Sequence, residues 1–216
     1  MTANSSIQAI SVPPSQGEKP THLLVALHGW GANAQDLVPF ARMFNLPQFG
    51  FMFPNAPFAH PQVPGGRAWY ALDSNEYRGL TQSRQLLLEW LQSLEKNTGV
   101  PLHRTFMAGF SQGGAMTLDV GLSLPLAGLC SLSGYLHAQP QARGERFALS
   151  VRERFPPVLI VHGRQDPVVP LQAAQQAREK LNALGINVKY REFNMGHEIQ
   201  PPVLTLIEKF IRDNQY

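Results

Sequence analysis

The chain has 216 residues and a mass of 24.0 kDa. That is enough for one sizeable core but short for two full domains, so we expect one domain spanning residues 1–216. Hydrophobic residues make up 44% of the chain and charged residues 15%, which excludes a disordered protein. The net charge of +3 is not gathered into a long basic run, so a nucleic-acid partner is not indicated.

Cysteine content and apolar runs indicate the compartment. The single cysteine, Cys130, lies among leucines and is expected to be a small buried side chain rather than a catalytic thiol. Residues 1–14 lack the basic start and apolar centre of a leader peptide, and the longest apolar runs, such as residues 23–27, are far too short to cross a bilayer. We therefore expect a soluble, cytoplasmic protein with no transmembrane segment.

Short apolar runs alternate with longer helical patterns along the chain. This alternation predicts an α/β fold, with a mostly parallel central sheet and helices on both of its faces. Most of the runs are apolar on both sides, so they need cover on both sides of the sheet. The predicted strands are residues 7–12, 22–28, 50–53, 105–110, 128–132, 158–162 and 188–193.

Leucines and alanines at helical spacing predict three long helices, at residues 81–97, 170–185 and 202–213. The Pro-rich residues 54–64 are interpreted as a long surface loop. Little length is left over, so we expect no separate cap domain. The charged stretch 143–154 is typical of a solvated surface.

Residues 105–116 run from an apolar strand through Gly109-Phe110-Ser111-Gln112-Gly113 into a helix of small residues. A nucleophilic serine must project from a sharp turn between a strand and a helix, and glycines on either side let the two cross closely. We therefore interpret Ser111 as a nucleophile. The alternative is an ordinary glycine-rich turn in which Ser111 only caps the helix.

A nucleophilic serine needs a base, and the base needs an orienting acid. Asp166 follows the predicted strand at 158–162, and His197 follows the strand at 188–193. The order Ser111, Asp166, His197 is typical of α/β-hydrolases, in which the site lies along the carboxyl ends of neighbouring strands. We predict that these three residues form a catalytic triad.

Other acids and histidines fit the pattern less well. His28 and His162 each precede a glycine at a strand end, where hydrogen bonds can brace the loops, so structural roles are expected. Asp119 lies eight residues beyond Ser111 within the helix, and Asp73 precedes the turn, so neither fits the order of the triad. The remaining histidines, which have no matching context, are His22, His60, His103 and His137.

Backbone amides are expected to bind the oxyanion, one from Gln112 and one from Trp30. Gly29 and Gly31 let the loop after the second strand turn so that the Trp30 amide faces the site. Two interpretations of the Trp30 side chain stay open: it covers the core, or it forms a wall of the acyl pocket.

Five segments carry a resemblance to a known family: His28-Gly29 with Gly31, Pro54-Asn55-Ala56-Pro57 with Ala68-Trp69-Tyr70, the turn from Gly109 to Ala115, His162 to Pro170, and Gly196-His197-Glu198-Ile199. In these the chain resembles the phospholipase/carboxylesterase family of α/β-hydrolases, which includes acyl-protein thioesterases and small carboxylesterases. The resemblance implies an α/β-hydrolase fold and a serine esterase. We expect Trp30, Trp69 and Asp73 to lie around the substrate pocket. Trp30 and Ala32 stand where many relatives have a leucine and an aspartate, so the pocket is expected to differ in size. Residues 136–155 match no part of the family, and their role stays open.

We interpret the chain as a serine hydrolase that cleaves carboxylic esters or thioesters of short to medium acyl chains through an acyl-enzyme. It needs no cofactor and no metal, since no Cys/His cluster has zinc-site spacing. The expected partner is a small ester or thioester, an acylated protein or a lysophospholipid. Three alternatives stay open: a lysophospholipase or a lactone hydrolase on the same scaffold, or a catalytically silent binding protein.

Overall fold

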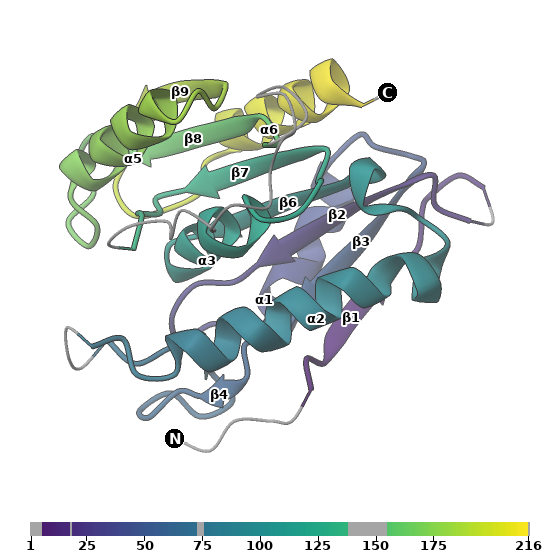
Figure 1. The fold of residues 1–216 in the computed structure, drawn as a ribbon, viewed down its shortest axis with the longest axis horizontal. Coiled ribbons are helices and arrows are strands. Elements are labelled where there is room, and N and C mark those ends of the chain that lie inside the picture. Colours follow the sequence, from purple (N-terminus) through teal and green to yellow (C-terminus); the bar gives the residue numbers. More distant parts are fainter. Residues whose placement is uncertain (1–5, 18, 73–75, 138–154, 216) are drawn as a thin grey trace.

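The computed structural model describes residues 6–17, 19–72, 76–137 and 155–215. Its centre is a seven-stranded sheet in the order β1-β3-β2-β6-β7-β8-β9 (Figure 1). Neighbouring strands are parallel except β1, which pairs antiparallel with β3. All seven predicted strands are confirmed: three keep their predicted bounds, and the ends of the other four shift by one or two residues. They are β1 (Ala9–Val12), β2 (His22–Leu27), β3 (Phe49–Pro54), β6 (Thr105–Phe110), β7 (Gly128–Leu132), β8 (Val158–Gly163) and β9 (Val188–Phe193).

Successive side chains of each strand point to opposite sides of the sheet. Because most strand residues are apolar, both faces of the sheet carry apolar side chains that pack into a core. Along β2, Leu23, Val25 and Leu27 pack into one apolar cluster. Leu24, which lies between the first two, packs into the cluster on the other face. The two clusters are separated by the sheet, and each needs its own layer of helices.

Helices α2 (Leu80–Thr98), α3 (Gln112–Gly121) and α5 (Leu171–Ala183) cover the first face. Helix α1 (Ala34–Leu37), the 3₁₀ helix η1 (Val38–Met43) and helix α6 (Pro201–Asn214) cover the second. A short 3₁₀ helix, η2 (Leu102–Arg104), leads into β6. The predicted α/β fold with helices on both faces is therefore confirmed (Figure 1).

Helix α2 shows how the sequence pattern produces these elements. Leu87, Leu91 and Leu94 recur at helical spacing and are at most 1% exposed. The helix ends at Gly99, which adopts φ 76°, and the Gly99 amide donates to the Glu95 carbonyl. A left-handed residue at this position favours glycine, so the helix stops there.

The interpretation of residues 54–64 as loop alone is wrong. Two short strands, β4 (Phe58–Ala59) and β5 (Arg67–Ala68), pair antiparallel, and the His60 amide donates to the Gly66 carbonyl at 2.8 Å. Two-residue strands are too short to show an alternating pattern in the sequence.

Helices α1 and η1 were not predicted. Pro39 has no amide hydrogen to continue the α-helical pattern, so the chain passes from a four-residue α-helix into a 3₁₀ turn. Among the described residues, no helix combines the length and the apolar content needed to cross a membrane. The charged stretch 143–154 and nearly all of residues 136–155 lie outside the described residues.

Candidate active site

Ser111 stands at the sharp turn between β6 and α3. Its backbone adopts φ 55° and ψ −119°, an uncommon region for a residue other than glycine. The Ser111 amide donates to the Leu132 carbonyl at 2.8 Å, which fixes the turn to the neighbouring strand. Strain of this kind is typical of a nucleophile elbow.

Glycines around Ser111 allow the backbones to approach closely. A Cβ atom on Gly109 would lie 2.2 Å from the Gly113 carbonyl oxygen, and one on Gly113 would lie 2.4 Å from the Leu27 carbonyl oxygen. A Cβ atom on Gly29 would lie 3.4 Å from the Cβ of Ser111. The loop after β2 therefore lies directly beside the serine.

The predicted acid and base meet at the same edge of the sheet. Asp166 follows β8 and His197 follows β9, and the His197 Nδ1 lies 2.7 Å from the Asp166 Oδ2. A carboxylate only accepts hydrogen bonds, so Nδ1 carries the proton and Nε2 is left as the acceptor. The imidazole of His197 lies against the ring of Phe110, which precedes Ser111, at 4.7 Å between centroids.

The surroundings of Asp166 keep it ionised. Burial by itself would raise the pKa of this carboxyl group, but hydrogen bonds from His197 and from the amides of Val169 and Val168 outweigh burial and hold the pKa below its ordinary value. Both amides donate to Oδ1 at 2.9 Å. The carboxylate is thus a fixed negative charge that orients the imidazole.

The loop after β2 carries the first predicted oxyanion amide, that of Trp30. Two hydrogen bonds tie the loop to β5: the Gly31 amide donates to the Arg67 carbonyl, and the Arg67 amide donates to the Ala32 carbonyl, each at 2.9 Å. Among the described residues, no hydrogen bond is formed by the amide of Trp30 or that of Gln112. The Trp30 ring is partly buried and packs edge-on against the His60 ring at 4.6 Å.

Gln112 supplies the second predicted amide, and its side chain is held on both sides. Gln112 Oε1 accepts from the Trp69 amide, and Nε2 donates to the Tyr70 carbonyl, each at 2.9 Å. Gln112 is 1% exposed, and both partner residues are fully buried. We call Gln112 with the backbone of Trp69 and Tyr70 the glutamine clamp. It fixes the first residue of α3.

One of the predicted pocket residues, Trp69, does not line a surface in this structure. Trp69 is 0% exposed, and its indole Nε1 donates to the His28 carbonyl at 3.0 Å. In this structure the ring is therefore packed in the core, where it supports the loop after β2. Asp73 lies outside the described residues.

The structural roles expected for two histidines are confirmed. His28 accepts from the Ala56 amide at Nε2, so its Nδ1 carries the proton that it donates to the Gly29 carbonyl at 2.8 Å. Burial lowers the pKa of His28 to about 4, so this imidazole is neutral. His162 Nε2 donates to the Val169 carbonyl at 2.8 Å and so braces the loop that holds Asp166.

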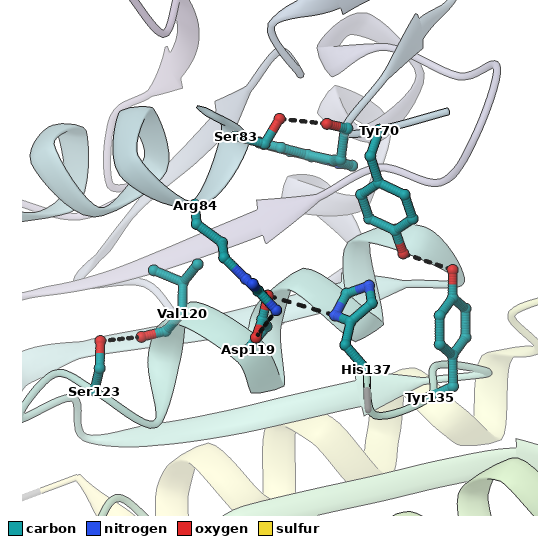
Figure 2. Close-up of polar contacts among 9 residues, drawn as sticks. Tyr70, Ser83, Arg84, Asp119, Val120, Ser123, Tyr135 and His137 are labelled. Atoms are coloured by element: carbon teal, nitrogen blue, oxygen red, sulfur yellow. Dashed lines mark hydrogen bonds and ion pairs between the residues drawn. The ribbon is translucent and has the colours of Figure 1, made fainter. Parts of the chain in front are cut away.

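A second polar cluster, which the sequence did not indicate, lies between α2 and α3 (Figure 2). Arg84 donates to Asp119, with Nη2 2.9 Å from Oδ1, and His137 Nδ1 lies 3.4 Å from Asp119 Oδ2. The hydroxyls of Tyr70 and Tyr135 are 2.5 Å apart. Burial would raise the pKa of Asp119, but His137 and Arg84 outweigh it and lower the pKa. These residues come from segments far apart in the sequence, so no spacing could have shown the cluster.

The site therefore offers a strained serine, a carboxylate-bound imidazole and two amides at one edge of the sheet. Among the described residues, no group of three or more His, Cys, Asp or Glu side chains could hold a metal ion. The sequence profile of the phospholipase/carboxylesterase family matches residues 9–215. The chain belongs to the phospholipase/carboxylesterase family.

Similar proteins support this assignment. An acyl-protein thioesterase 1 of Schizosaccharomyces pombe is 31% identical over 206 residues, which cover 89% of this chain and 88% of the relative. An acyl-protein thioesterase 1 of Gibberella zeae is 28% identical over 210 residues, which cover 86% and 84%. The crystal structure of esterase PE8 is 30% identical and covers 97% of this chain and 99% of its own, with a TM-score of 0.85. Membership in this family makes the chain a hydrolase.

Proposed function

We propose that this family member hydrolyses carboxylic esters and thioesters through an acyl-enzyme on Ser111. The observation that carries the proposal is the 2.7 Å hydrogen bond from His197 to Asp166, made beside a serine held in a strained turn. The names of the relatives, acyl-protein thioesterase and esterase, support this class of substrate.

In the first half of the reaction, Ser111 Oγ attacks the acyl carbonyl carbon, and His197 Nε2 accepts the hydroxyl proton. Asp166 stabilises the imidazolium that forms and holds its Nδ1 proton in place. The tetrahedral oxyanion accepts hydrogen bonds from the amides of Trp30 and Gln112, each of which is worth about 10²- to 10³-fold in kcat in comparable sites. The bond to the leaving oxygen or sulfur then breaks, and the leaving group takes the proton from His197.

In the second half, water repeats the attack on the acyl-enzyme. His197 takes one proton from the water, and the hydroxide adds to the acyl carbonyl; as the tetrahedral intermediate collapses, the protonated His197 gives that proton to the departing Ser111 Oγ. The carboxylic acid leaves, and the enzyme is restored. Apart from the substrate and water, each step uses only side chains and amides of this chain.

Removal of the serine hydroxyl tests the proposal. Ser111→Ala is expected to abolish hydrolysis of p-nitrophenyl acetate and of an acyl-thioester, with little change in melting temperature. Ser133 provides the matched control, because it is also buried and has φ 47° at the end of β7. Ser133→Ala is expected to keep its activity. Turnover by folded Ser111→Ala at the wild-type rate would refute the mechanism.

A further inference from the structure

Trp30 is the one residue of the loop after β2 whose backbone has no hydrogen-bond partner among the described residues. Each other residue of this loop, which spans residues 28–33, has a backbone hydrogen bond to β5, to a side chain or within the loop. Glycines flank Trp30, and Gly31 adopts φ 81°, so the neighbouring backbone does little to fix it. The direction of the Trp30 amide, one of the two proposed oxyanion donors, therefore depends on what holds the Trp30 ring.

The ring of His60, at the end of β4, packs against the Trp30 ring. The two centroids are 4.6 Å apart and the planes meet at 72°, an edge-to-face arrangement. The edge of His60 that carries Cδ2 and Nε2 faces the loop, because a Cβ atom on Gly31 would lie 3.5 Å from Cδ2 and 3.6 Å from Nε2. His60 therefore borders both the Trp30 ring and the backbone beside it.

His60 is itself held in one orientation and one tautomer. Its Nδ1 accepts from the amide of Gln62 at 3.1 Å and from the amide of Val63 at 3.0 Å. An imidazole nitrogen that accepts hydrogen bonds carries no proton, so the ring proton lies on Nε2. Nε2 is buried and has no hydrogen-bond partner among the described residues. This N–H is therefore available for a contact with an aromatic ring, which is weakly favourable.

The backbone of the β4–β5 hairpin is also fixed to the loop. The His60 amide donates to the Gly66 carbonyl at 2.8 Å. A Cβ atom on Gly66 would lie 2.4 Å from the Gly31 carbonyl oxygen, so the two backbones are in direct contact there. His60 thus belongs to a unit that is fixed to the loop on the far side of Trp30, and the place of its ring determines where the Trp30 ring can lie.

We propose that His60 is a positioning residue: the edge of its imidazole fixes the Trp30 indole and thereby directs the Trp30 amide at the oxyanion. The inference rests on the proposed function, because it requires an oxyanion to form at Ser111. A donor stabilises developing charge best when it is already aimed before the reaction begins. Loss of the contact is therefore expected to slow the chemical steps without weakening the binding of substrate.

His60→Asn tests the proposal, because Asn can still accept hydrogen bonds from nearby backbone amides but has no ring. With p-nitrophenyl acetate, kcat is expected to fall about tenfold, less than the roughly 10²- to 10³-fold that loss of a whole oxyanion donor costs. KM is expected to stay within about twofold of wild type. His60→Phe places a ring edge beside Trp30 again and is expected to recover most of kcat. His103→Asn is the matched control, because it makes the same change at an exposed position of η2, and it is expected to keep the wild-type kcat.

Two further measurements separate positioning from a merely structural role. A trifluoromethyl ketone forms an adduct with the serine that carries an oxyanion, so its inhibition constant is expected to rise by the factor by which kcat/KM falls in His60→Asn. Trp30→Ala removes the ring on which His60 acts, and it is expected to lower kcat by a similar factor. Adding His60→Asn to Trp30→Ala is then expected to lower kcat no further. Trp30→Ala also tests the contact from its other side if His60→Asn does not fold.

Folded His60→Asn or Trp30→Ala with the wild-type kcat and inhibition constant would overturn the proposal. A change in KM alone would overturn it as well, because the two rings would then form a wall for the substrate. Additive losses in the double variant would show that His60 does not act through Trp30. Absence of any ester turnover by the wild-type protein would instead refute the proposed function itself.

Discussion

Truncation of Gln112 tests whether the glutamine clamp holds the oxyanion amide in place. Gln112→Ala removes two hydrogen bonds and leaves the Trp69 amide and the Tyr70 carbonyl buried without partners. Each unsatisfied group costs about 1 to 3 kcal/mol, so the free energy of unfolding is expected to fall by roughly 2 to 6 kcal/mol. The loosened amide lowers kcat by up to about 10²- to 10³-fold, with little change in KM. Urea unfolding and ester kinetics on the same preparation measure both effects.

Gln112→Glu is the isosteric control. As a neutral acid it can accept from the Trp69 amide and donate to the Tyr70 carbonyl, but as a carboxylate it would place a buried charge against that carbonyl. Its pKa is therefore expected to be raised in the folded state, so its stability relative to wild type should be largest at low pH and be lost as pH rises. A Gln112→Ala protein that unfolds within about 0.5 kcal/mol of wild type and keeps its kcat would refute the clamp.

Three further predictions follow from buried groups. Burial lowers the pKa of His28 to about 4, so below pH 6.5 the unfolded chain binds more protons than the folded protein, and the free energy of unfolding should fall by roughly 3 kcal/mol from pH 6.5 to 4. Urea unfolding measures this; an equal fall of the free energy of unfolding in the His28→Asn variant would contradict it. Asp166→Asn should lower kcat by up to ~10⁴ at saturating substrate, whereas Asp119→Asn should mainly cost stability, and the reverse order would mean that the acid is misassigned. Gly113→Ala should lower both melting temperature and kcat, because its Cβ atom would lie 2.4 Å from a carbonyl oxygen; a fully stable, active variant would show that the close crossing is not needed.

The sheet could be predicted because its strands are apolar on both faces and bounded by glycine or proline. Cys130 illustrates this, since it lies fully buried within the predicted strand β7. The small elements could not be predicted, because they show no such pattern in the sequence. Helix α1 and strands β4 and β5 are at most four residues long, so they show no periodicity, and tertiary contacts determine them.

The approach of Asp166 to His197 was predictable because parallel strands bring their carboxyl ends to one edge of the sheet. The role of Trp69 was not, because sequence position does not distinguish a pocket wall from a buried side chain that supports a loop. The pairing of Arg84 with Asp119 joins two helices, and nothing in either local sequence indicates it. Contacts between distant segments depend on packing, which no short motif reports.

The central claim is that Ser111 forms a covalent acyl-enzyme. A fluorophosphonate probe tests it most directly, because it reacts with an activated serine and leaves a stable adduct that intact-protein and peptide mass spectrometry can locate. We predict one adduct per chain, at Ser111, with loss of ester hydrolysis in proportion to labelling and no adduct in Ser111→Ala. An active protein that stays unlabelled, or that carries its adduct at another residue, would contradict the account.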